Sequence, residues 1–359
     1  CVRHFCTVHI LFSTKLKSIC LSCKIQKQNM LKSALKKINV LIPLDSKFPL
    51  NYMIPVYHLV SDENLPHVRN IINYKNSSDF EKDIDFMLKN FDFVDWEFFK
   101  NNYNTKAKKP CVLLTFDDGL IEFKDVVMPI LLRKGIYAIN FINPSFVENR
   151  DIMFRMKASL LIEQINKNDF KLSKTIIDFL GLKSNSKDDA VATIKKINYN
   201  KRSSLDKLSE LMDYDFQEYI KNHKIYMNEE DLSFAKKEGF GIAAHSWDHP
   251  YFFDLNLADQ LENAQKSINY IKDKGFLNEA FAFPFTDLGI KNIFFEELFS
   301  ENEDLKFTFG TSGVKTDSYP KNLHRIAMEN GSSAESELGF ESNYYRVKNI
   351  FNKNQIKRL

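Results

Sequence analysis

The sequence predicts an α/β protein whose strands and helices form a β/α barrel. Short apolar runs with the character of buried strands alternate with longer amphipathic stretches, which is typical of βαβ units and a parallel sheet. Polar residues able to do chemistry follow several of these runs directly. The carboxyl ends of the strands of a β/α barrel gather at one face, where active sites form. Because the chain has 359 residues, we expect one large domain with an insertion.

The predicted strands are short, apolar and bounded by turn residues. The polar cluster 61–64 ends the first of them, and Pro284 ends the fifth. The predicted strands are residues 53–60, 112–116, 136–142, 241–244, 280–283, 307–310 and 323–327.

The predicted helices carry apolar residues at helical spacing together with start and stop signals. Ser78 and Glu81 have the spacing of a capping box at the start of the first helix. Pro129 is expected to distort the second helix, which Gly135 ends. The predicted helices are residues 78–91, 120–134, 228–236 and 254–274.

The segment from about residue 150 to residue 226 differs from the rest of the chain. Lys, Asn, Ser and Asp become frequent, strand-like runs become scarce, and helical patterns replace them. We expect a mostly helical insertion. The insertion is compatible with a lid, with a surface that binds a partner, or with a long connection that has no function of its own. It contains no residues of catalytic character.

The charge balance excludes nucleic acid as the main partner. The chain has 50 Lys and Arg against 47 Asp and Glu, a formal charge of +3. Its 44% hydrophobic and 13% aromatic content indicates a well-packed globular protein, and aromatic rings also serve sugar-binding clefts.

The first residues of the chain are predicted to lie outside the barrel domain. Four of the five cysteines fall in the first 23 residues, so the core carries no disulfide framework. Alternatively, these four cysteines could form a zinc site, but their spacing fits no standard zinc-binding module. Because the first Met is Met30, we expect residues 1–29 to be a disordered or non-native leader and residues 30–359 to form the barrel domain.

The sequence contains no apolar run long enough to span a membrane, so a cytoplasmic location is expected. Residues 31–38 are basic and amphipathic. They fit peripheral contact with an anionic membrane surface, or the commoner case of a solvated helix face.

Two adjacent carboxylates end the second predicted strand in the sequence Thr-Phe-Asp-Asp-Gly at 115–119. Burying two like charges is costly unless a cation or hydrogen-bond donors compensate them. His245 and His249 supply two imidazoles at the end of a later strand. The pattern predicts a mononuclear metal site, whereas an isolated Asp pair is more often a helix cap or a turn.

These residues, 115–119 together with His-Ser-Trp-Asp-His-Pro at 245–250, resemble the first two motifs of the polysaccharide deacetylases. The resemblance extends over roughly residues 53–329. It implies a distorted, incomplete (β/α) barrel. It also implies that Asp118, His245 and His249 hold a divalent metal, with Zn²⁺ expected, and that Asp117 is the general base that activates the attacking water.

The third motif departs from the common family pattern. Ala282 stands where many members have an Arg that supports the base. The segment 281–285, Phe-Ala-Phe-Pro-Phe, is similar to that of the branch of poly-N-acetylglucosamine and cell-surface polysaccharide deacetylases. The resemblance implies that the backbone N–H of Phe285 helps to hold the oxyanion, and a plain strand end is the alternative.

The resemblance leaves two candidates for the general acid. His324, at the end of the last predicted strand, is the first. The related branch often has Leu-Pro-Arg-Ile there, which makes Arg325 the better-matched residue. His58, in a Tyr-His-x-Val context that the branch also shows, is the second candidate. Either histidine is equally compatible with a structural role.

The expected function is that of a metal-dependent hydrolase that removes N-acetyl groups from an N-acetylated sugar of a polysaccharide or a lipid-linked glycan. Two alternatives remain open at this stage. One is an O-acetyl esterase of the xylan type that uses the same metal site. The other is a catalytically silent member of the fold that binds saccharide.

Overall fold

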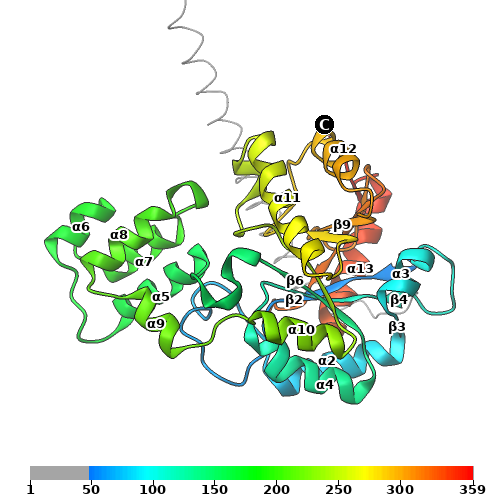
Figure 1. Ribbon diagram of the computed structural model, residues 1–359, viewed down its shortest axis with the longest axis horizontal. Helices are drawn as coiled ribbons and strands as arrows, with labels where there is room; N and C mark the ends of the chain where they lie inside the picture. Colours follow the sequence, from blue (N-terminus) through cyan, green and yellow to red (C-terminus); the bar gives the residue numbers. More distant parts are fainter. Residues whose placement is uncertain (1–47, 359) are drawn as a thin grey trace, which may run out of the picture. The chain divides into compact units, whose positions relative to one another are not determined.

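The computed structural model describes residues 48–358. Its centre is a parallel sheet with the strand order β11-β9-β8-β7-β6-β5-β2-β12, around which helices pack (Figure 1). The strands are β2 (Pro55–Tyr57), β5 (Leu114–Asp117), β6 (Ala138–Ile142), β7 (Gly241–Ala244), β8 (Ala280–Ala282), β9 (Phe307–Gly310), β11 (Asn322–His324) and β12 (Ile326–Ala327).

The sheet closes into a barrel at Arg325. β11 and β12 are two halves of one extended segment, and the first pairs with β9 while the second pairs with β2 at the opposite edge of the sheet. The N–H of Arg325 donates to the carbonyl of Gly310 at 2.9 Å, and the N–H of Ile326 donates to that of Ile54 at 2.8 Å. One segment thus joins both edges, which confirms the predicted distorted (β/α) barrel.

Side chains alternate between the inside and the outside of the barrel, as strand geometry requires. The buried interior includes Ile139 and Phe141 of β6, Phe309 of β9 and Leu323 of β11. Ala138 and Ile142, which flank this pair on β6, belong instead to the apolar cluster that the strands share with the helices around the barrel. The same alternation decides which polar residues reach the open end of the barrel.

Helices cover the outside of the barrel. They are α2 (Ser77–Asn90), α3 (Trp96–Asn102), α4 (Met128–Lys134), α10 (Glu229–Lys237), α11 (Leu257–Asp273), α12 (Asn292–Glu301) and α13 (Ala334–Ile350). The short strands β1 (Tyr52–Met53), β3 (Asp92–Phe93) and β4 (Cys111–Val112) form a second sheet, and β10 (Thr316–Asp317) pairs with β13 (Gln355–Ile356).

The predicted insertion is helical. Its helices lie together beside the barrel in Figure 1 and pack around their own apolar cluster. They are α5 (Phe154–Asn166), α6 (Lys174–Leu180), α7 (Lys187–Lys195), α8 (Ser203–Leu211) and α9 (Phe216–Asn222), with short helical turns at η2 (Pro144–Asn149) and η3 (Tyr199–Lys201).

Local signals predicted the strands of the barrel and the helices α2, α4, α10 and α11, but not α3, α12 and α13. The capping box at Ser78 is wrong, because Asn76 caps α2 by accepting a hydrogen bond from the N–H of Asp79 at 2.7 Å. Asn caps helices as well as Ser does, so α2 begins earlier in the chain than predicted. The predicted distortion at Pro129 is confirmed by the π-helical turn η1 (Phe123–Val127) that precedes α4.

Several predictions concern residues beyond the described range. The leader 1–29, its four cysteines and the basic stretch 31–38 lie outside the described residues. Within 48–358, Cys111 is a buried free thiol, and none of the helices combines the length and apolar composition needed to cross a bilayer.

Truncating the barrel interior is expected to destabilise the fold strongly. Phe309 is completely buried and its ring contacts those of Phe141 and Trp96. Phe309→Ala is therefore expected to lower the free energy of unfolding by about 3–5 kcal/mol, measured by urea denaturation. The matched control Phe98→Ala, at a side chain that is 50% exposed, should change it by less than about 0.5 kcal/mol. Equal effects of the two variants would contradict the assignment of Phe309 to the core.

Candidate metal centre and active site

Asp118, His245 and His249 converge at the carboxyl ends of β5 and β7. The Oδ1 atom of Asp118 lies 3.3 Å from Nε2 of His249 and 3.6 Å from Nε2 of His245. All three side chains are buried, and one ligand atom from each lies within 4.8 Å of the other two. The structure therefore brings together the residues that the sequence predicted as metal ligands.

The donor atoms of this cluster fit a divalent cation. Within the described part of the chain, Asp118 Oδ1 and the Nε2 atoms of both histidines have no hydrogen-bond partner. Buried polar atoms without partners are costly. A carboxylate and two imidazoles are ligands that Zn²⁺ favours, and three protein ligands leave a position open for substrate or water. A bound cation would satisfy all three atoms at once.

Two of the three residues of the cluster have a backbone conformation that is rare for residues other than glycine. Asp118 has φ 74° and His249 has φ 62°, both in the left-handed region. Non-glycine residues adopt this conformation at a cost of order 1 kcal/mol or more, and such residues gather at functional sites. Gly119 follows with φ 68°, and an added Cβ there would press on Ile142. The turn after β5 therefore requires glycine at 119.

The protonation states suit metal binding. Nδ1 of His245 lies 2.9 Å from the carbonyl oxygen of Ala282, to which it donates, so Nε2 carries the free lone pair. Burial lowers the pKa of His245 to about 4. Burial alone would raise the pKa of Asp118, but the neighbouring histidines hold it well below its usual range. The ligand set is therefore a neutral imidazole beside an ionised carboxylate.

Asp117 is held by a buried arginine. Arg325 donates from both terminal nitrogens to the two carboxylate oxygens, at 2.5 and 2.8 Å. Asp117 Oδ2 also lies 3.6 Å from Nε2 of His245. Burial opposes ionisation of Asp117, but Arg325 lowers the pKa of its carboxyl below the ordinary value. Asp117 is thus an ionised carboxylate of set orientation beside the metal ligands.

Arg325 fills a role that sequence reasoning placed elsewhere. Because Ala282 stands where many family members have an arginine, the sequence offers no residue there to orient Asp117. The sequence places Arg325 only as an alternative match to His324 on the last strand. The structure brings its guanidinium from the closing segment to the carboxylate, where it is fully buried. The Leu-His-Arg-Ile segment contained the signal, since it resembles Leu-Pro-Arg-Ile of the related branch.

His58 lies at the same site with a carboxylate behind it. Its Nδ1 lies 2.7 Å from Oε2 of Glu329, and its Nε2 lies 4.0 Å from Oδ2 of Asp117. Glu329 also accepts hydrogen bonds from the N–H groups of His58 and Leu59. Burial alone would lower the pKa of His58, but the carboxylates of Glu329, Asp118 and Asp117 raise it to about 9. Sequence reasoning did not identify Glu329.

The structure does not bring His324 into this cluster. Its neighbours Leu323 and Arg325 point into the barrel, so His324 faces outward by strand alternation. There its Nε2 lies 2.9 Å from Oδ2 of Asp317, and the guanidinium of Arg358 binds the same carboxylate. The geometry therefore favours His58 over His324 as the candidate acid.

Phe285 forms one wall of the site. Its ring stacks on Tyr251 with centroids 3.7 Å apart and meets the ring of His249 edge-on at 4.4 Å. Its φ is 56°, and no acceptor among residues 48–358 binds its backbone N–H. A cavity of about 200 Å³ opens here, lined by His58, Asp118, His249 and Phe285, by apolar side chains that include Met153 and Met156 of the insertion, and by the charged side chain of Arg155.

The parallel barrel, with Asp and His side chains gathered at the carboxyl ends of its strands, agrees with the distorted (β/α) barrel that the sequence resemblance implied. The deacetylase PplD of Streptococcus pyogenes, solved in complex with acetate, superposes with a TM-score of 0.51 at 15% identity, covering 81% of this chain and 97% of its own. This chain therefore has the deacetylase fold.

Two further solved structures superpose with lower scores. IcaB from Ammonifex degensii gives a TM-score of 0.49 at 13% identity, covering 81% of this chain and 97% of its own. The de-N-acetylase from Aggregatibacter actinomycetemcomitans gives 0.48 at 12% identity, covering 80% and 99%. No protein-family model and no curated protein sequence matches this chain.

Removing one imidazole is expected to abolish tight metal binding. Loss of an outer hydrogen-bond partner typically costs roughly 10- to 100-fold in metal affinity, so His249→Ala should cost more than this. Zinc content after dialysis, measured by plasma mass spectrometry, checks the prediction. The control His223→Ala, at an exposed histidine of the insertion, should keep the zinc content of the unaltered protein. Full zinc retention by His249→Ala would contradict the assigned ligand set.

Proposed function

We propose that the protein is a metal-dependent hydrolase that removes N-acetyl groups from an N-acetylated sugar of a polysaccharide or a lipid-linked glycan. The observation that carries this proposal is the set of three neighbouring units at one barrel end. They are the cation ligands, the ionised Asp117 on Arg325 and the protonated His58 on Glu329. Hydrolysis of an amide needs a base and an acid together, and the fold is that of a deacetylase.

A divalent cation held by Asp118, His245 and His249 would polarise the acyl carbonyl and make water more acidic. Asp117 takes the proton from the attacking water, since its carboxylate is ionised and oriented by Arg325. Arg325 also prevents the Asp117 carboxylate from turning to become a further cation ligand, because it holds both oxygens. Asp117 and Asp118 are therefore assigned different tasks although they are neighbours in the chain.

His58 returns a proton to the leaving group. An amine anion is a poor leaving group, so the nitrogen must be protonated as the carbon–nitrogen bond breaks. Glu329 binds Nδ1 of His58 and so directs its Nε2–H toward the site. The environment thus lowers the pKa of the base Asp117 and raises that of the acid His58, the separation that assigns the two roles.

The backbone N–H of Phe285 is assigned to the oxyanion. It lies in the wall of the cavity beside His249, and stacking of the Phe285 ring on Tyr251 keeps this turn in place. A donor of this kind typically contributes to binding the charge that develops on the carbonyl oxygen.

Two aspartate variants should separate catalysis from metal binding. Asp117→Asn removes the base and leaves the charge of Arg325 uncompensated, so the variant should be less stable. In the folded protein, acetate release from N-acetylglucosamine oligosaccharides should fall about 10²–10⁴-fold while the metal content is kept. Asp118→Asn removes a cation ligand, so both activity and metal content should be lost. Activity that survives complete metal removal by a chelator would overturn the mechanism.

The assignment of His58 as the acid predicts that activity decreases at high pH. His58 works in its protonated form, so activity should fall as the pH rises through its pKa. Glu329→Gln removes the carboxylate that raises this pKa, and the fall should move to lower pH by about one unit or more. The pH profile of kcat/KM measures the shift, with Glu303→Gln on the surface as the control. An unchanged alkaline limb in Glu329→Gln would assign the acid elsewhere.

The two alternatives are less well supported. A silent saccharide-binding protein was suggested by the absence of an Arg at 282, and Arg325 now supports the base in its place. An O-acetyl esterase would need its acid less, because an alkoxide leaves more easily than an amine anion. The elaborated His58–Glu329 pair therefore favours the amide, and rates on matched amide and ester substrates distinguish the two.

A further inference from the structure

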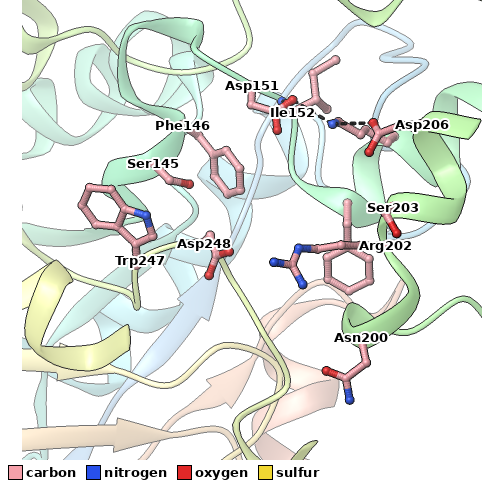
Figure 2. A pocket seen from close by; sticks show the side chains of 12 residues that line it. Ser145, Phe146, Asp151, Ile152, Asn200, Arg202, Ser203, Asp206, Trp247 and Asp248 are labelled. Carbon is pink, nitrogen blue, oxygen red and sulfur yellow. Dashed lines mark hydrogen bonds and ion pairs between the residues drawn. The ribbon is translucent and has the colours of Figure 1, made fainter. Parts of the chain in front are cut away.

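A second cavity lies between the helical insertion and the loop that carries the metal-ligating histidines. Its volume is about 540 Å³, which is within the range of small-molecule binding sites. Figure 2 shows Trp247 and Asp248 of the histidine loop on one side and Asn200 and Arg202 of the insertion on the other. Asn200 and Arg202 are exposed, so the cavity is open to solvent on the side of the insertion.

This cavity adjoins the active site. Trp247 and Asp248 directly precede the metal ligand His249. The start of α5 separates the two cavities, since Phe154 lines the larger one and Met153 lines the one at the metal centre. The ring of Phe154 also contacts that of Phe285 edge-on, with centroids 6.2 Å apart. A chain-like substrate bound at the metal centre has the larger cavity as its neighbour.

The charged groups Asp248 and Lys157 of the cavity are held in place by other side chains. Asp248 accepts hydrogen bonds from Tyr199 at 2.5 Å and from Asn263 at 2.8 Å. Lys157 pairs with both Asp151 and Asp206 at 2.9 Å. Polar groups that are already oriented bind a ligand at a lower entropic cost than mobile ones.

The lining matches the chemistry of a sugar ring. A pyranose has an apolar C–H face and a rim of hydroxyl groups, and it needs an aromatic surface together with carboxylate, amide and guanidinium partners. Trp247 is half-buried and offers the aromatic surface, while Asp248, Asn200 and Arg202 offer the polar partners. An anionic ligand fits less well, because three carboxylates line the cavity and its Lys157 is already paired.

We propose that this cavity binds further sugar units of the glycan whose neighbouring unit occupies the metal centre. The substrate is then an oligosaccharide or a longer chain, and the insertion sets this length requirement. The inference rests on the proposed function for the identity of the glycan.

Binding measurements test the proposal independently of turnover. The probe is the tetrasaccharide of N-acetylglucosamine, titrated into the full-length protein by calorimetry. The double variant Asn200→Ala, Arg202→Ala loses hydrogen bonds worth about tenfold in affinity together, so its Kd should rise by about this factor. Lys201→Ala, an exposed neighbour on the same turn that does not line the cavity, should bind like the unaltered protein. The monosaccharide should bind more weakly and show no difference between the variants.

Tryptophan emission gives a second readout. The sequence has two tryptophans, and Trp96 is buried in the barrel core. Addition of the tetrasaccharide should change the emission, and Trp247→Phe should remove the change. Equal tetrasaccharide affinity in the double variant, or no binding at all, would overturn the proposal. Tetrasaccharide binding that the double variant weakens, without any acetate release, would instead retain the site and reject the proposed function.

Discussion

The buried ion pair between Arg325 and Asp117 connects the closure of the barrel with its chemistry. Arg325 stands at the point where one segment pairs with both edges of the sheet, and its guanidinium binds both oxygens of Asp117. Removing either partner would leave an uncompensated buried charge, which is among the most destabilising changes in a protein interior. The position of Asp117, the proposed base, therefore depends on the closure of the sheet.

The other side chains of the site take different protonation states within a few ångströms. Burial keeps His245 neutral, whereas the Glu329 carboxylate favours protonation of His58 although both are histidines at strand ends. Asp118 and Asp117 are both ionised, but one faces the imidazoles while the other faces Arg325. Local partners, rather than residue type, thus divide the tasks of ligand, base and acid.

The helical insertion builds the surroundings of this centre. Its first helix contributes one apolar and one charged side chain to each cavity, Met156 and Arg155 to the smaller and Phe154 and Lys157 to the larger. The histidine loop carries ligands on one side and Trp247 with Asp248 on the other, so one loop serves both cavities. In the proposed function, this arrangement places a second cavity beside the reacting centre, and the insertion would take part in the choice of substrate.

The sequence by itself determined the alternation of strands and helices, the bounds of β7 and β9, and the proximity of Asp118 to the two histidines. Local periodicity and strand-end placement contain this information. Only the tertiary structure decided that Arg325 supports Asp117 and that His58, not His324, faces the site. Those contacts join residues 208 positions apart, and 271 apart for His58 and Glu329. They depend on barrel closure and on which face of a strand points inward, and a one-residue offset separates Arg325 inside the barrel from His324 outside it.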